Sequence, residues 1–382
     1  RADALPLANS IRKHPNIMRK IRVLIVDDSV VIRRLLTDIL AQDPEIEVVG
    51  TAPNGRIALA KLSQVNPDLV TLDIEMPELD GLSTLPLLRK DYPKLPVIMF
   101  STLTERGAAA TFDALARGAT DYVAKPANVG SVAAGMESVR VQLIPKIKSL
   151  CPFNTPATTV ATPAATAPKI TPKRPIIKNQ RCDAVVIGSS TGGPQALTAV
   201  LNRLPASFPV PIVIVQHMPP VFTRHLANRL NQECALTVRE AVAGEALECG
   251  EVLIAPGDFH LEIQRQGVAI RTMLQQGPAE NSCRPAVDVL FRSAAKAYGA
   301  GLQAVVLTGM GQDGKRGAEC IVQAGGTVIA QDEASSVVWG MPRAVTEAGL
   351  ANKVLALQLI PDELLRRVAV ARQTALTCER IA

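Results

Sequence analysis

The chain has 382 residues, of which 47% are hydrophobic and 20% are charged. This length is sufficient for two domains, and the composition is that of a folded protein rather than a disordered one. No run of residues approaches the roughly 18 consecutive apolar positions of a membrane span, and no signal-peptide pattern is present at the N-terminus. We therefore expect a soluble cytoplasmic protein without membrane insertion.

Cysteine spacing and the distribution of charge exclude several further classes. The seven cysteines are scattered, which argues against a disulfide framework or a common zinc motif and fits a reducing compartment. Of the net charge of +6, residues 1–20 contribute +4 and residues 144–182 contribute +7, so the rest of the chain carries −5. A DNA-binding domain concentrates positive charge on a folded face, and we therefore expect no nucleic-acid partner.

Composition divides the chain into four segments. Residues 1–17 show no periodicity and are interpreted as a disordered tail or an artificial extension. Seven prolines lie between residues 145 and 175, among threonines and alanines, which predicts a basic, extended linker over residues 146–180. Domains are therefore expected over residues 18–145 and 181–382.

The first domain alternates short β-branched runs with helical patterns. Strands are predicted over residues 21–26, 47–49, 69–72, 97–100 and 121–123. Helices are predicted over residues 30–41, 56–65, 83–89, 108–117 and from about 129. Strands that are apolar on both faces and alternate with helices are typical of a doubly wound parallel sheet.

Acidic residues follow the predicted strands of this domain, where ligands bind in open α/β sheets. Asp27 and Asp28 follow the first strand and Asp73 follows the third. Such carboxylates repel one another unless a divalent cation neutralises them, and Mg²⁺ prefers oxygen ligands. Ser101 and Lys125, after the fourth and fifth strands, would suit a phosphoryl oxygen. A plainer interpretation makes Asp28 part of a helix cap and Asp73 a solvated loop residue.

The motifs VDDS, LDIEMPELDGL, STL and DYVAKP, in this order within residues 21–145, resemble the receiver domain of bacterial response regulators. The resemblance implies a flavodoxin-like fold and phosphorylation of Asp73 by a histidine kinase. It implies that Mg²⁺ is held by Asp27, Asp28, Asp73 and the backbone carbonyl of Glu75. It further implies that the phosphoryl group is contacted by Lys125 and sensed by Ser101 and Tyr122.

The second domain repeats the α/β alternation. Strands are predicted over residues 184–188, 212–216, 252–255, 304–307 and 327–330, with a hairpin-like insertion around residues 260–270. The segment GSSTGG follows the first of these strands. It could bind phosphate at a helix N-terminus, but it lacks the lysine of a P-loop and departs from GxGxxG. The alternative use of a sharp strand-to-helix turn is to present a serine above the sheet beside free backbone N–H groups.

A nucleophilic serine needs a base, and the chain has only four histidines. His14 lies in the tail, His225 falls within a predicted helix, and His260 lies between short strands without an acidic partner. His217 directly follows the second strand of this domain. This leaves His217 as the candidate base.

A third partner follows the strand predicted over residues 304–307. Its glycine-rich turn contains Asp313 and exposes backbone amides. Ser190, His217 and Asp313 thus each follow a separate parallel strand, which is the arrangement that a catalytic triad requires.

The motifs GxSTGG, QHMPP, LIAPGDFHL, CRP and GMGxDG closely resemble the catalytic domain of the chemotaxis protein-glutamate methylesterase family, a Rossmann-like α/β domain. The resemblance implies Ser190 as nucleophile, His217 as base and then acid, and Asp313 as the residue that orients the imidazole. It implies an oxyanion contact from the Met310 amide, an assisting role for Thr191 and no cofactor at the hydrolase site.

The implied substrates are methyl-accepting chemoreceptors. Their glutamyl methyl esters would yield methanol, and specific glutamines would be deamidated to glutamate. Two alternatives stay open: a second domain that only binds a nucleotide or partner, and a transcription regulator. The set of Ser190, His217 and Asp313 argues against the first alternative. The charge distribution and the lack of a helix-turn-helix argue against the second.

Overall fold

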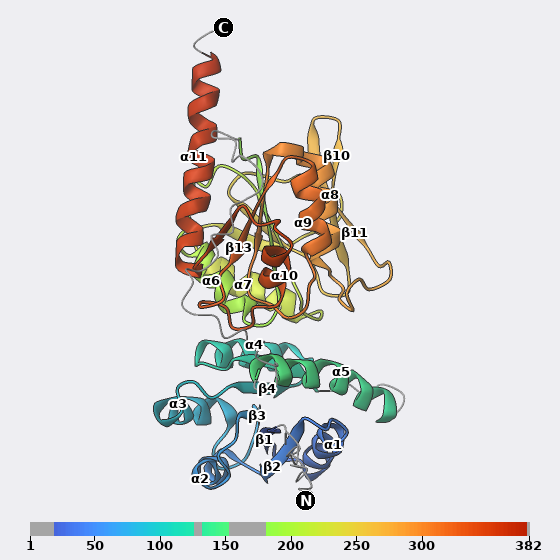
Figure 1. Ribbon diagram of the computed structural model, residues 1–382, viewed down its shortest axis with the longest axis vertical. Coiled ribbons are helices and arrows are strands. Elements are labelled where there is room, and N and C mark those ends of the chain that lie inside the picture. Colours follow the sequence, from blue (N-terminus) through green and yellow to red (C-terminus); the bar gives the residue numbers. More distant parts are fainter. Residues whose placement is uncertain (1–18, 126–131, 153–180, 380–382) are drawn as a thin grey trace, which may run out of the picture.

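The computed structural model describes residues 19–125, 132–152 and 181–379, which form two α/β domains stacked along the long axis of the molecule (Figure 1). The predicted tail and residues 153–180 of the predicted linker lie outside the described residues. Residues 146–150, also assigned to the linker, are instead helical and continue the first domain, because Ile147 is buried in its core. Among the helices of the described ranges, none combines the length and apolar character needed to cross a bilayer.

The first domain is built on five parallel strands in the order β2-β1-β3-β4-β5. This is the flavodoxin-like order, and the predicted fold class is confirmed. The strands are β1 (Ile21–Val26), β2 (Ile46–Ala52), β3 (Leu69–Asp73), β4 (Val97–Ser101) and β5 (Asp121–Ala124). The helices are α1 (Val30–Leu40), α2 (Gly55–Val65), α3 (Gly81–Asp91), α4 (Glu105–Ala116) and α5 (Val132–Leu150).

A local sequence signal explains where α1 begins, and core packing explains why α5 continues past a proline. Ser29 caps α1, because its side chain accepts a hydrogen bond from the amide of Ile32. Helix α5 passes through Pro145, where the domain boundary is predicted, and ends at Leu150. Leu143 and Ile147 are fully buried on either side of this proline, so core packing holds the helix together there.

The second domain is built on a seven-stranded parallel sheet in the order β14-β13-β12-β6-β7-β9-β8. Its first strand, β6, lies centrally between β7 and β12, as in Rossmann-like sheets. The strands are β6 (Ala184–Ser189), β7 (Ile212–Gln216), β8 (Thr237–Glu240), β9 (Glu251–Ile254), β12 (Leu302–Val306), β13 (Thr327–Gln331) and β14 (Lys353–Leu355). The helices are α6 (Gly193–Leu201), α7 (Phe222–Glu233), α8 (Val287–Tyr298), α9 (Lys315–Gln323), α10 (Met341–Glu347) and α11 (Ile360–Glu379).

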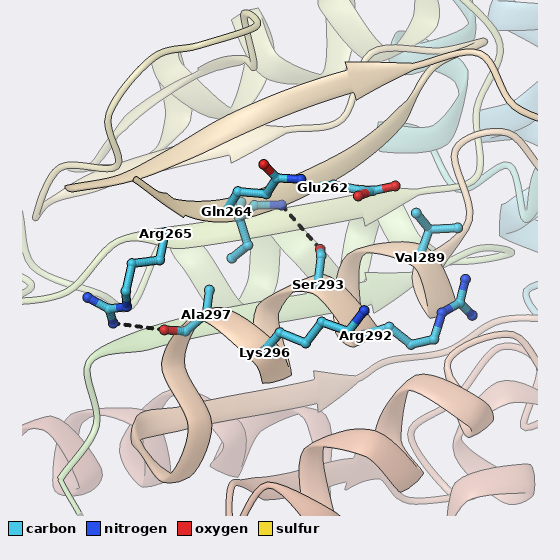
Figure 2. A pocket seen from close by; sticks show the side chains of 9 residues that line it. Glu262, Gln264, Arg265, Val289, Arg292, Ser293, Lys296 and Ala297 are labelled. Carbon is cyan, nitrogen blue, oxygen red and sulfur yellow. Dashed lines mark hydrogen bonds between the residues drawn. The ribbon is translucent and has the colours of Figure 1, made fainter. Parts of the chain in front are cut away.

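The predicted hairpin is present as the antiparallel pair β10 (His260–Gln266) and β11 (Ala269–Gln275). Figure 2 shows how it meets α8: Ser293 Oγ accepts from the amide of Ile263, and Arg265 donates to the carbonyl of Ala297. A cavity of about 300 Å³ lies at this contact. Its lining comes from β10 and α8, so it is separate from the loops that follow the strands of the main sheet.

The domains meet through an apolar contact flanked by charged groups. Tyr122 in β5 stacks on Phe222 in α7, with ring centroids 4.7 Å apart and an angle of 2° between the ring planes. The ring centroid of Phe112 lies 6.4 Å from that of Phe222. Around these rings, Glu105 pairs with both Arg224 and His225 of α7. In Figure 1, α4 and α5 lie on the side of the first domain that faces α6 and α7. The carboxyl ends of β6 and β7 therefore point toward the first domain.

Candidate active site and receiver pocket

Three carboxylates converge at the carboxyl ends of β1 and β3, which are hydrogen-bonded neighbours. One ligand atom from each of Asp27, Asp28 and Asp73 lies within 4.8 Å of the others. Asp27 and Asp73 are buried, whereas Asp28 is exposed. The residues predicted to form an acidic pocket are thus brought together.

One lysine is the cation that faces this pocket. Lys125 Nζ lies 3.0 Å from Asp27 Oδ2 and 2.8 Å from Asp73 Oδ1. Burial raises the pKa of Asp73 to about 6, and the charge of Asp27 adds to this shift, although Lys125 opposes it. Burial likewise raises the pKa of Asp27. A single lysine does not balance three carboxylates, and this set of hard oxygen donors fits Mg²⁺.

The other predicted receiver residues surround the same end of the sheet. The side chain of Glu75 points away to Arg106, at 3.1 Å, so only its backbone is available to the pocket. Ser101 is buried at the end of β4 and donates to the carbonyl of Gly107 at the start of α4. Tyr122 is buried against Phe222 of the second domain, and burial raises the pKa of its hydroxyl well above the usual value. Tyr122 is therefore part of the domain contact, and Ser101 connects β4 to α4.

The sharp turn after β6 carries Ser190. The Ser190 amide donates to the carbonyl of Thr308, which follows β12. Gly192 has φ = 75°, in the left-handed region that glycine adopts most easily, and α6 begins directly afterwards. A Cβ on Gly309 would lie only 2.9 Å from Cβ of Ser190, so the glycine-rich loop after β12 is what allows close approach to the serine.

His217 and Asp313 form a pair beside this turn, with Asp313 buried and His217 partly exposed. His217 Nε2 lies 2.8 Å from Asp313 Oδ2. Because an ionised carboxylate only accepts hydrogen bonds, Nε2 carries the proton and Nδ1 is left as the basic nitrogen. The Cys283 thiol lies 3.4 Å from Nδ1. Burial opposes protonation of His217, but its interactions with Cys283 and Asp313 outweigh burial and raise the pKa of the imidazole.

Backbone amides hold the Asp313 carboxylate in its ionised form. Its Oδ2 accepts from the amide of Val287, and its Oδ1 accepts from the amides of Asp288 and Gly314. Burial opposes ionisation, but His217 and these amides lower the pKa of Asp313 below its usual value. The side chain of Asn281 adds a further donor to Oδ1 at 2.8 Å.

Ser190, His217, Met310 and Asp313 line one cavity of about 500 Å³. Its opposite wall comes from the first domain and includes Lys125. Within the described ranges, the Ser190 hydroxyl makes no hydrogen bond with His217. Catalytic hydrogen bonds of unliganded enzymes are often long and tighten only with substrate.

Thr191 and Ser189 are placed differently from Ser190. Thr191 is buried, and its hydroxyl has no partner among the described residues. Ser189 is also buried, and its hydroxyl donates to Oε1 of Gln216 at 2.7 Å. The amide nitrogen of Gln216 then donates to the carbonyls of Ser190, at 2.9 Å, and His217, at 3.3 Å. Gln216 thus connects the backbones of both candidate catalytic residues.

Sequence reasoning did not find Gln216, Asn281 or Asp288. Gln216 immediately precedes His217, and its strand-end position was a usable signal. Asn281 and Asp288 lie in a turn and a helix that the chain brings to Asp313 from more than twenty residues away, so no local pattern marks them. His225 and His260 are structural here: the first pairs with Glu105, and the second is hydrogen-bonded to backbone groups.

Comparisons with known proteins identify both domains. A model of the response regulator receiver domain matches residues 23–136, and a model named CheB methylesterase matches residues 185–364. Two relatives are named protein-glutamate methylesterase/protein-glutamine glutaminase. The one from Nocardioides sp. is 56% identical over 93% of this chain and 97% of its own length. The one from Trichodesmium erythraeum is 53% identical over 92% of this chain and 100% of its own length.

A solved structure, the CheB methylesterase catalytic domain of Thermotoga maritima, is 49% identical and covers 48% of this chain and 98% of that chain, with a TM-score of 0.48. The receiver domain and the second domain together define a response regulator with a hydrolase-type output domain. The chain belongs to the protein-glutamate methylesterase/protein-glutamine glutaminase family.

Proposed function

We propose that this chain is a phosphorylation-activated hydrolase of bacterial chemoreceptors or of a parallel chemosensory pathway. It removes methyl esters from receptor glutamates, releasing methanol, and deamidates specific receptor glutamines to glutamate, releasing ammonia. The observation that carries the proposal is the His217–Asp313 pair, joined at 2.8 Å, which opens onto the same cavity as Ser190. The names of the relatives support the same chemistry.

In the acylation step, Ser190 Oγ attacks the ester carbonyl while His217 Nδ1 takes the hydroxyl proton. Asp313 stabilises the resulting imidazolium through Nε2. The carbonyl oxygen becomes an oxyanion, and the backbone amide of Met310 lies on the loop that would donate to it. Collapse of this intermediate breaks the ester C–O bond, and methanol leaves with the proton from Nδ1.

In the deacylation step, water attacks the acyl-serine as His217 takes its proton. Ser190 then leaves as the alcohol, and the receptor side chain becomes a carboxylate. With a glutamine substrate, ammonia replaces methanol as the leaving group. Thr191 has an assisting role within the turn, since its carbonyl accepts from Thr308. No cofactor is needed for these steps.

In the receiver domain, a histidine kinase would transfer a phosphoryl group to Asp73. Mg²⁺ would be held by Asp27, Asp28, Asp73 and the backbone carbonyl of Glu75, and when bound it would neutralise the phosphoryl oxygens. Lys125, already 2.8 Å from Asp73, would contact the phosphoryl group.

Control of the hydrolase follows from the contact between the domains. The new phosphoryl oxygens would attract the Ser101 hydroxyl, and Tyr122 would reorient into the space vacated beside it. Tyr122 would then leave its stack on Phe222, which weakens docking and opens the cavity to a receptor. We therefore infer three attributes: a chemoreceptor substrate, a kinase phosphodonor and a cytoplasmic location. Six of the seven cysteines have described side chains, and these six are free, which is compatible with that location.

Methanol release from methylated receptor membranes tests the proposal directly. Ser190→Ala should lower the rate by about 10⁴-fold or more with the fold intact. Ser189→Ala is the matched control: it loosens Gln216 but removes no reacting atom, so it should keep most of the activity. If the two effects are reversed, or if the parent protein releases no methanol, the proposed function is wrong.

A further inference from the structure

Two carboxylates lie buried next to each other behind His217. The side chains of Asp313 and Asp288 belong to residues that are 2% and 1% exposed. The side-chain nitrogen of Asn281 lies between them, 2.8 Å from Asp313 Oδ1 and 3.0 Å from Asp288 Oδ2. Each carboxylate also accepts a backbone amide, which favours its charged form. Burial and the charge of Asp313 nevertheless raise the pKa of Asp288.

We propose that Asn281 is a positioning residue of the hydrolase. Its amide bridges the two buried carboxylates and thereby keeps Asp313 turned toward His217. This inference rests on the proposed function, because it assigns Asn281 to the same reaction. Among the described residues, the Asn281 side chain hydrogen-bonds to the two carboxylates and not to the Ser190 hydroxyl or the imidazole.

The chemistry of the position favours an amide over other side chains. A neutral NH₂ group has two N–H bonds on one nitrogen, so it can donate to both carboxylates at once. Asn281 is itself exposed, but an aspartate here would place a third negative charge beside two buried carboxylates. A lysine or arginine would pair with Asp313 and compete with His217 for it. Asparagine donates to both carboxylates without competing with His217 for Asp313.

The backbone around Asn281 is built to present this side chain. Glu280 and Cys283 exchange two backbone hydrogen bonds, at 3.1 and 2.9 Å, which close a tight turn. The two central residues, Asn281 and Ser282, have φ angles of 52° and 62°. Asparagine tolerates this left-handed conformation better than most residues. The same turn carries Cys283 to Nδ1 of His217, so one short segment contacts both members of the His217–Asp313 pair.

Few other charged groups face the pair. Glu280 is held in a two-bond ion pair by Arg292, and Arg316 also acts on Glu280. The first domain contributes Lys125 and Lys146 to the far wall of the cavity. Arg284 lines the same cavity and is paired with Asp258, and Cys283, Asp288 and Asp313 lie beside His217 or its partner. A change of charge at residue 281 would therefore act on His217 mainly through the two carboxylates.

Asn281→Gly tests the proposal in the full-length protein. Glycine keeps the positive φ and removes only the amide side chain, and Ser282→Gly makes the same backbone change one residue later. Asn281→Gly should lower kcat for methanol release by about 10- to 100-fold with little change in KM, the effect expected for losing one hydrogen bond to a charged group. Ser282→Gly should change kcat by no more than about twofold. Equal losses in the two variants would show that only the turn matters and would overturn the proposal.

The pH dependence separates positioning from a general loss of structure. Without the bridging amide, the two carboxylates exert a stronger negative potential on the imidazole and stabilise its protonated form. The acidic limb of the activity profile should therefore move to higher pH in Asn281→Gly and further in Asn281→Asp. A reduced fraction of folded enzyme would lower the rate at every pH without moving the limb.

An NMR titration of the His217 ring gives the same information without activity. The pKa of the imidazole should rise in Asn281→Gly and Asn281→Asp and stay at the parent value in Ser282→Gly. An unchanged pKa in both Asn281 variants refutes the bridge whatever the activity shows. A parent protein with the expected NMR shifts but no methanol release would instead refute the proposed function alone.

Discussion

The two domains use the same residue type at the same kind of position with opposite electrostatics. Asp73 and Asp313 are both buried aspartates at or just beyond the carboxyl end of a parallel strand. Asp73 accepts one backbone amide, from Ile74, and pairs with Lys125 while other carboxylates crowd it. Burial raises the pKa of Asp73 to about 6, whereas the donors around Asp313 lower its pKa.

The difference lies in the number of donors that the surrounding chain supplies. Asp313 accepts from three backbone amides, from the Asn281 side chain and from His217. Protein groups alone satisfy the charge of Asp313, which suits a residue that must stay ionised and keep a fixed position. Asp73 keeps unsatisfied charge, which suits a residue that must attract a cation and then accept a phosphoryl group.

The largest effect is expected on kcat when Asp313 is replaced, and it tests this comparison between the two aspartates. Asp313→Asn should lower kcat by about 10³- to 10⁴-fold, because an amide favours the wrong imidazole tautomer and does not stabilise the imidazolium. The acidic limb of the residual activity should move to lower pH, since loss of the carboxylate lowers the pKa of His217. A pH–rate profile of methanol release measures both changes. A shift to higher pH, or near-parent turnover, would remove Asp313 from the proposed triad.

A smaller effect is expected on the free energy of unfolding. Replacing aspartate by asparagine should stabilise the first domain at Asp73 and destabilise the second domain at Asp313. The raised pKa of Asp73 stabilises the protein only below its ordinary value near 4, and this contribution is lost as pH rises through about 6. At pH 7 without divalent cations, Asp73→Asn should therefore raise the free energy of unfolding of the first domain by about 1 kcal/mol or more.

Asp313→Asn should lower the stability of the second domain by about 1–3 kcal/mol, because an amide nitrogen would face backbone donors. The lowered pKa of Asp313 means that the parent keeps this stabilisation at neutral pH and loses it in acid. Calorimetry can follow both domains, and the single tryptophan, Trp339, reports on the second by fluorescence. Destabilisation by both substitutions would contradict the comparison.

The sequence was informative where function follows directly from strand order. Asp27, Asp73, Ser190, His217 and Asp313 all lie at or just after strand ends, and adjacent parallel strands bring such positions together. For the same reason the two parallel sheets were predicted correctly. The edge strands β8 and β14 were not predicted, because they bury few apolar residues, unlike the equally short β5 and β9.

Tertiary contacts supplied what the sequence could not. The choice of Nε2 rather than Nδ1 for Asp313 depends on how the ring is held between Asp313 and Cys283. The GxSTGG motif selects Ser190 over Ser189, and packing adds the physical reason, since Ser189 is buried against Gln216. The stack of Tyr122 on Phe222 joins residues 100 positions apart in separate domains.

The central claim is that the acidic pocket of the first domain controls the cavity of the second. It is tested most directly by the rate of methanol release from methylated receptor membranes, with and without a small-molecule phosphodonor and Mg²⁺. The full-length protein should be stimulated by a factor of about 5 to 150, the range of a coupling free energy of about 1–3 kcal/mol. For Asp73→Asn the ratio of the two rates should fall to about one. Equal stimulation of the parent and Asp73→Asn, or none in the parent, would contradict the account.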